Sequence, residues 1–200
     1  MTYAIKKPTR LILIPGATDG NESKPRASWM MPLANKIRHE FGTESPGFQW
    51  PIYKETFGVT NWLTFLSRQI ESNADSAIVT HCIGGYGALE LIKTNRIVPP
   101  HMLVLVAPPS AENLNDNPKL KELAEKAVET KTRIVSTDGK IFIYCSENDP
   151  LSSLAQSRKL GERLGAEVIV IDNAGHFDND ENRLMIAEKI YQLLGFTKSS

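Results

Sequence analysis

The amino-acid sequence predicts an open, mostly parallel α/β sheet with helices on both faces. Its short apolar runs are continuous rather than alternating, which is typical of strands that are buried on both faces of a parallel sheet. Segments with apolar residues at helical spacing separate these runs, as crossovers between parallel strands require. The chain has 200 residues, of which 41% are hydrophobic, and we expect one domain over residues 1–200.

Five strands are expected at the apolar runs, namely Leu11–Ile14, Ala77–Val79, Met102–Val106, Ile141–Tyr144 and Val168–Ile171. Trp50–Phe57 is expected to add an edge strand, because Pro51 has no N–H to donate to a central ladder. Loops are expected where Gly, Pro, Asn and Ser gather, at Gly16–Ala27, Phe41–Phe48 and Pro108–Pro118.

Four helices are expected from apolar stripes at spacings of three and four residues, around Leu63, Leu123, Leu160 and Ile190. Gly165 and Gly195 follow the last two stripes and are expected to end those helices. The connection from Ala107 to Lys140 has room for one helix and loops but not for a large lid.

The composition excludes several classes of partner. Lys and Arg number 23 and so do Asp and Glu, so the chain offers no excess of positive charge to nucleic acid or to an anionic membrane. No apolar run approaches the ~18 residues that span a bilayer, and the first residues lack the features of a secretory signal. We expect a cytoplasmic protein that acts on a small molecule, and the sequence identifies no protein partner.

No metal or cofactor is expected. The two cysteines, Cys82 and Cys145, cannot supply a zinc site of four thiolates. The four histidines lack the close spacing of metal ligands. The glycine-containing loop after the first strand lacks both the G-x-G-x-x-G and the Walker pattern, which argues against a nucleotide site.

The stretch Thr80-His81-Cys82-Ile83-Gly84 matches the nucleophile-elbow pattern G-x-S-x-G, with Thr at the first glycine and Cys at the serine. The elbow is a cramped strand-to-helix turn, and its glycines allow backbone segments to approach closely. It would place Cys82 at a helix N-terminus, which favours a thiolate. The ordinary interpretation of such a cysteine is a small buried apolar side chain. The side chain of His81 is expected to point away from the nucleophile and to be structural.

Two further strand ends carry groups that complete a catalytic triad. Asp149 precedes Pro150, which holds it extended in a fixed turn, and Glu147 is the second candidate for the acid. His176 lies in a glycine-containing loop after the last strand. Each residue alone would be an ordinary loop residue. The order Cys, Asp, His is that of hydrolase triads on α/β sheets.

The motifs P-G-A, T-H-C-I-G-G, S-E-N-D-P, L-G-A-E and N-A-G-H-F span most of the chain. With them the sequence resembles the small, lidless α/β-hydrolases of the YdeN and retinoblastoma-binding-protein-nine-like serine hydrolase family. The resemblance implies the α/β-hydrolase fold and a catalytic triad of Cys82, Asp149 and His176. It also implies an oxyanion hole from the N–H groups of Ala17 and Ile83. Cys82 and Thr80 depart from the family pattern, although the related dienelactone hydrolases also use a cysteine.

The expected function is hydrolysis of small ester, lactone or thioester substrates through an acyl-enzyme intermediate. An acyltransferase and a noncatalytic binding protein on a hydrolase fold are the alternatives. Trp29 could line an acyl pocket or belong to the core. If the strands follow the family order, Met102–Val106 separates Cys82 from Cys145 by about 10 Å, which exceeds the ~7 Å limit for a disulfide.

Overall fold

The computed structural model describes residues 7–18, 29–41, 47–49, 53–54, 58–129 and 134–196. A six-stranded sheet runs through its centre in the order β3-β1-β5-β6-β7-β8. Every neighbouring pair of strands in this sheet is parallel. The strands are β1 Arg10–Ile14, β3 Gly47–Gln49, β5 Ser76–His81, β6 Met102–Val106, β7 Lys140–Cys145 and β8 Glu167–Val170. The expected parallel sheet and the five expected strands are confirmed.

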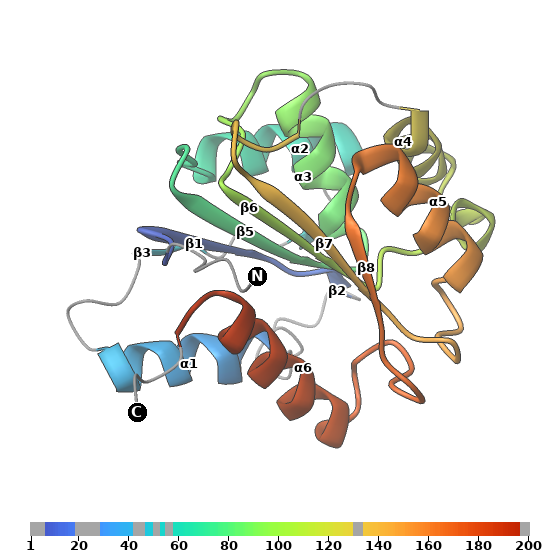
Figure 1. Ribbon diagram of the computed structural model, residues 1–200. Helices are drawn as coiled ribbons and strands as arrows, with labels where there is room; N and C mark the ends of the chain where they lie inside the picture. Colours follow the sequence, from blue (N-terminus) through green and yellow to red (C-terminus); the bar gives the residue numbers. More distant parts are fainter. Residues whose placement is uncertain are drawn as a thin grey trace.

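Helices cover both faces of the sheet (Figure 1). One face carries α1 Met30–Phe41 and α6 Asp180–Leu193, which contact each other. The other face carries α2 Gly58–Gln69, α3 Gly84–Lys93, α4 Pro118–Glu129 and α5 Leu154–Leu164. A short 3-10 helix, η4 Ala111–Leu114, precedes α4 in the connection between β6 and β7. The sheet is therefore the middle layer of three.

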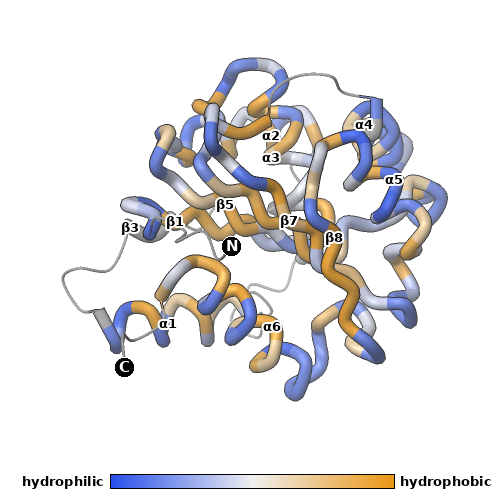
Figure 2. The backbone as a smooth tube through the Cα atoms, viewed as in Figure 1, coloured by the Kyte–Doolittle hydropathy of each residue, from blue (hydrophilic) through white to orange (hydrophobic). Residues whose placement is uncertain are grey.

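Both faces of the central strands are buried, which explains their unbroken apolar sequences. In β5, Ile78 packs into the core beneath α2 and α3, whereas Ala77 and Val79 pack into the core beneath α1 and α6. Side chains alternate between the two faces of a strand, so a strand covered on both sides needs apolar residues at every position. Figure 2 shows this apolar interior along β5 and β7 and the polar outer surfaces of the helices.

The prediction that Trp50–Phe57 forms the edge strand was wrong in its position. The edge strand beside β1 is β3, where Gly47 pairs with Arg10 and Gln49 pairs with Ile12. Within Trp50–Phe57 the structure describes only β4 Tyr53–Lys54, which pairs with β2 Ala17–Thr18 in a separate two-stranded sheet. Pro51 argued against a central strand, but it could not indicate which strand this segment would pair with.

The ends of the last two helices agree with the sequence. Gly165 follows α5 with a φ of 64°, in the left-handed conformation that commonly ends a helix. The side chain of Ser153 begins α5 by accepting a hydrogen bond from the N–H of Gln156. Gly195 lies just after α6 with a φ of 76°.

The N-terminus of α3 packs directly against the end of β1. A Cβ added to Gly84 would lie 2.5 Å from the carbonyl oxygen of Ile14 and 2.7 Å from that of Pro15. A Cβ on the neighbouring Gly85 would meet only side-chain atoms, of Leu105 and Thr80, each at 3.2 Å. Gly84 therefore allows an approach of two backbone segments, whereas Gly85 faces groups that can shift.

We expect Gly84→Ala to lower the free energy of unfolding by about 1–3 kcal/mol or more, because the new methyl group overlaps fixed carbonyl oxygens. Gly85→Ala is the matched control and should cost much less, since alanine also raises helix propensity by up to about 1 kcal/mol. Urea unfolding followed by circular dichroism measures both. Equal stability of Gly84→Ala and wild type would contradict this packing.

Candidate active site

Three loops at the carboxyl edge of the sheet bring Cys82, Asp149 and His176 together. Cys82 directly follows β5, Asp149 follows β7, and His176 follows β8. Because all these strands are parallel, their carboxyl ends meet at one edge, where ligands bind in open α/β sheets. The Nδ1 atom of His176 lies 2.9 Å from Oδ2 and 3.1 Å from Oδ1 of Asp149.

The backbone at Cys82 has the strained geometry of a nucleophile elbow. Its φ is 54°, a left-handed value that costs a residue other than glycine about 1–3 kcal/mol. Residues in such strained conformations cluster at functional sites. The N–H of Cys82 donates to the carbonyl of Val106 at 2.9 Å, and its own carbonyl accepts from Gly85 at 3.2 Å. The turn is therefore held at both ends by hydrogen bonds.

The loop after β1 crowds the nucleophile from the other side. A Cβ added to Gly16 would lie 2.7 Å from the Cβ of Cys82 and 3.4 Å from its Sγ. Gly16 therefore brings a backbone segment against the sulfur, beside the predicted oxyanion donor Ala17. Ile83, the other predicted donor, is buried directly after Cys82. The roles of these two N–H groups stay predictions.

Thr80, which departs from the elbow pattern, is accommodated by a hydrogen bond. Its side chain is completely buried, and its hydroxyl donates to the carbonyl of Val104 on β6 at 3.2 Å. A buried hydroxyl without such a partner would be costly. Threonine can thus replace the leading glycine while the turn keeps its strained form.

Asp149 is held rigidly beneath His176. Its side chain is 0% exposed, and its Oδ1 accepts hydrogen bonds from the N–H groups of Leu151 and Ser152 at 2.8 and 3.1 Å. The carboxylate accepts from Nδ1–H of His176, which leaves Nε2 to face Cys82. Glu147, the second candidate for the acid, is exposed instead.

The environment of His176 favours its protonated form. Burial by itself lowers the pKa of the imidazole, but hydrogen bonds with Asp149 and Cys82, together with their negative charges, outweigh burial. The net effect raises the pKa of His176 to about 10 from the ordinary 6.5. The group can therefore accept a proton readily and can hold it beside sulfur.

Sequence reasoning missed the polar residues that hold the His176 loop. The hydroxyl of Ser146 accepts a hydrogen bond from the N–H of Ala174 at 2.9 Å and donates to Oδ1 of Asn148 at 2.8 Å. The same oxygen of Asn148 accepts from the N–H of Gly175 at 2.8 Å. The S-E-N-D-P motif thus supplies the acid and two loop anchors, and the signal for the anchors was the Ser and Asn spacing within that motif.

His81 lies beside His176, a contact that the sequence did not predict. Its Nε2 is 2.9 Å from the carbonyl oxygen of His176, and the two rings are 4.8 Å apart between centroids. Burial and the nearby His176 lower the pKa of His81 to about 4, so its ring is neutral near neutral pH.

Trp29 and Cys145 belong to the interior. Trp29 is 1% exposed in the core beneath α1 and α6, and its ring meets His81 edge-on at 6.0 Å. A contact between Trp29 and substrate stays a prediction. Cys145 is buried and Cys82 is partly buried; both thiols are free, and β6 lies between β5, which ends just before Cys82, and β7, which ends with Cys145.

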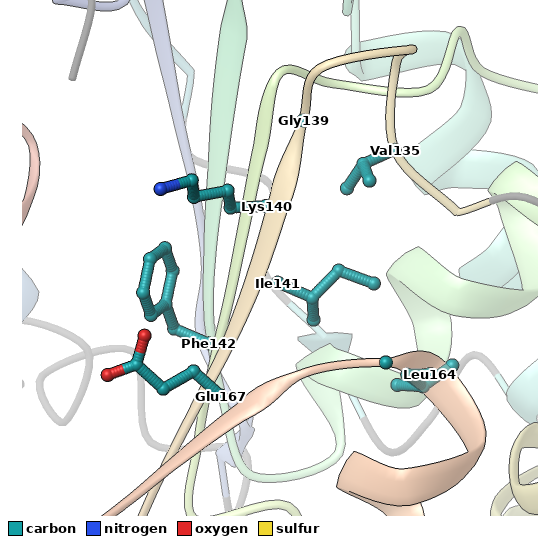
Figure 3. Close-up of a pocket in the computed structure, with 8 residues that line it drawn as sticks. Val135, Gly139, Lys140, Ile141, Phe142, Leu164 and Glu167 are labelled. Atoms are coloured by element: carbon teal, nitrogen blue, oxygen red, sulfur yellow. The ribbon is translucent and has the colours of Figure 1, made fainter. Parts of the chain in front are cut away.

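The pocket in Figure 3 lies at the opposite edge of the sheet. It has a volume of about 380 Å³, and Lys140 and Glu167, which begin β7 and β8, contribute to its lining. The Lys140, Phe142 and Glu167 side chains point to one side of the strand, and Val135, Ile141 and Leu164 lie on the other (Figure 3). This pocket is separate from the cluster at the carboxyl edge.

The described part of the chain offers neither a metal site nor a membrane-spanning helix. Within the described ranges, no group of three His, Cys, Asp or Glu side chains could hold a metal ion. Among the helices that the structure describes, none is long and apolar enough to cross a membrane.

Comparison with known proteins finds relatives in sequence and in fold. A rat protein, serine hydrolase RBBP9, is 21% identical over 179 residues, which cover 87% of this chain and 90% of that protein. The crystal structure of the ydeN gene product from Bacillus subtilis superposes with a TM-score of 0.67 at 15% identity, covering 94% of this chain and 99% of that one. Mouse alpha/beta hydrolase domain-containing protein 10 superposes with a TM-score of 0.60 at 13% identity, covering 95% and 91%.

These structural neighbours establish the α/β-hydrolase fold that the resemblance implied. The family model described as serine hydrolase matches residues 11–194, which is nearly the whole chain. The chain therefore belongs to the serine hydrolase family, with cysteine at the position where the elbow pattern has serine.

Proposed function

We propose that the protein hydrolyses small esters, lactones or thioesters with Cys82 as nucleophile, His176 as general base and acid, and Asp149 as the group that orients His176. The observation that carries the proposal is the position of His176, whose Nδ1 lies 2.9 Å from Oδ2 of Asp149 and whose imidazole interacts with the thiol of Cys82. A nucleophile, a base and an orienting acid in this succession define a triad by geometry.

In the first half of the reaction, the proton of Cys82 passes to Nε2 of His176, and the sulfur attacks the substrate carbonyl. The resulting oxyanion accepts hydrogen bonds from the N–H groups of Ile83 and Ala17. Each such donor is typically worth about 3–4 kcal/mol in the transition state. His176 then protonates the leaving group, the bond between it and the acyl carbon breaks, and a thioester on Cys82 remains.

In the second half, His176 takes a proton from water, and the oxygen of that water attacks the thioester. The bond between sulfur and the acyl carbon breaks, the thiolate leaves, and the carboxylic acid is released. Asp149 keeps Nδ1 protonated throughout, so the same nitrogen, Nε2, exchanges protons in both halves. An acceptor other than water at the second step would give acyl transfer.

The described part of the β6–β7 connection contains η4 and α4 as its only helices. The short connection supports small or surface-presented substrates over long ones enclosed by a lid. Relatives and neighbours in this fold are named as serine hydrolases and alpha/beta hydrolases, which supports acyl chemistry in general.

We expect mass spectrometry to detect an acyl adduct on the peptide that contains Cys82 after brief exposure to p-nitrophenyl acetate or to an acetyl thioester.

Turnover should fall by at least about 10³-fold in Cys82→Ala, because the proposed intermediate forms on this sulfur. Cys145→Ala is the matched control and should keep the wild-type rate, since that thiol is buried and β6 separates its strand from the one that precedes Cys82. An unchanged rate in Cys82→Ala would eliminate the proposed nucleophile, and absence of both adduct and turnover would favour a noncatalytic binding protein.

Asp149→Asn should lower turnover by about 10²- to 10⁴-fold, because an amide no longer selects the tautomer with a proton on Nδ1. Glu147→Gln is the control two residues away and should change the rate less than about twofold, since its side chain is exposed. Steady-state kinetics on the same ester measures both variants. The reverse ranking would assign the acid to Glu147.

A further inference from the structure

His81 connects the strand that carries the nucleophile to the loop that carries His176. It is the last residue of β5 and immediately precedes Cys82. Its Nε2 lies 2.9 Å from the main-chain oxygen of His176. A carbonyl oxygen only accepts hydrogen bonds, so Nε2 of His81 must carry the proton and donate it. His81 therefore links the two proposed catalytic residues: it is joined to Cys82 by a peptide bond and to His176 by a hydrogen bond.

The loop around His176 needs this support because its backbone is strained. Asn173, Gly175 and Phe177 have φ values of 53°, 56° and 59°. Two of these residues are not glycine, and such conformations persist only where the surroundings enforce them. A carbonyl beside them that lost its partner would be left unsatisfied next to buried groups.

The other anchors of the loop come from the β7 side. Ser146 and Asn148 hold the N–H groups of Ala174 and Gly175, and Asp149 holds the imidazole ring. These anchors set the loop relative to Asp149. The hydrogen bond from His81 sets it relative to Cys82, which is the distance that proton transfer from sulfur depends on.

The ring of His81 is itself held in place. It lies 4.8 Å from the ring of His176 at an angle of 44°, and it meets the indole of Trp29 edge-on at 6.0 Å and 80°. Trp29 is almost completely buried, so it provides a fixed surface behind His81. A neutral ring at this point adds no positive charge that would oppose the protonation of His176.

We propose that His81 is a positioning residue, which holds the main chain of His176 so that its imidazole stays within hydrogen-bonding reach of Cys82. The inference rests on the proposed function, because it gives His81 a role in the Cys–His pair of that reaction. His81 itself touches neither the substrate nor the sulfur in this account.

The test is the pH dependence of Cys82 alkylation by iodoacetamide, measured by peptide mass spectrometry without any acyl substrate. His81→Leu removes the donor, and His81→Gln keeps an N–H₂ group at similar reach. His101→Leu is the control, since His101 is also partly buried but precedes β6 at the opposite edge of the sheet. The thermal midpoint of each variant is measured in parallel.

In His81→Leu we expect alkylation at about pH 6.5 to slow by at least about tenfold, because the imidazole of His176 is no longer held within hydrogen-bonding reach of the sulfur. His81→Gln should recover most of the wild-type rate, and His101→Leu should match wild type. If His81→Leu does not fold, His81→Phe takes its place, because it keeps a ring against Trp29 and lacks the donor.

A wild-type profile in His81→Leu or His81→Phe would overturn the inference. A profile shifted equally in His81→Gln would also overturn it, because the donor would then not be the cause. These outcomes differ from failure of the proposed function, in which wild-type Cys82 is alkylated rapidly but forms no acyl adduct and supports no turnover. Slow alkylation of the wild type itself would contradict both.

Discussion

The left-handed backbone of Cys82 is the constraint on which the rest of the site depends. This conformation turns the side chain above the edge of the sheet, and it persists because β1 and α3 enclose it. Gly16 and Gly84 allow the enclosing segments to approach so closely that a methyl group at Gly16 would overlap the Cβ of Cys82 and one at Gly84 would overlap backbone carbonyl oxygens. The strain at one residue is thus maintained by packing across three elements, and the sheet places the two partner loops at the same edge.

A second feature is the complete satisfaction of polar groups around His176. The carboxylate of Asp149 is fully buried and accepts hydrogen bonds from two backbone N–H groups as well as from the imidazole. A buried charge pair is tolerated when its remaining hydrogen-bond donors and acceptors have partners in this way. The same bonds hold His176 in one tautomer. The same hydrogen bonds therefore stabilise the His176 loop and hold His176 in the tautomer in which it can act as a base.

The sequence predicted the layers and the three principal residues because their signals are local or follow from topology. Continuous apolar runs identified β1 and β5 to β8, and the order Cys82, Asp149, His176 followed from strand ends that must meet at one edge. The edge strand was displaced because three residues at Gly47–Gln49 carry too little pattern to indicate a partner. Strand pairing at an edge is decided by tertiary contacts that the local sequence does not contain.

The roles of His81 and Asn148 could not be predicted for a different reason. Each acts on the backbone of a residue far along the chain, and no periodicity records such a contact. His81 follows the alternation of its strand, since its ring meets Trp29 on the face where Ala77 and Val79 are buried, but alternation does not predict its contact with the carbonyl of His176. Thr80 was a departure from the elbow pattern whose partner, the carbonyl of Val104, belongs to another strand.

The central claim is that Cys82, His176 and Asp149 act as one hydrogen-bonded unit, and the protonation state of His176 tests it most directly. Nitrogen-15 nuclear magnetic resonance of labelled histidine, at about pH 8, distinguishes imidazolium from neutral imidazole, and an ordinary histidine is neutral there. We expect both ring nitrogens of His176 to be protonated in the wild type, because Asp149 and Cys82 raise its pKa, and we expect Cys82→Ala to shift it toward the neutral form. A neutral His176 in the wild type, unchanged by Cys82→Ala, would contradict the account.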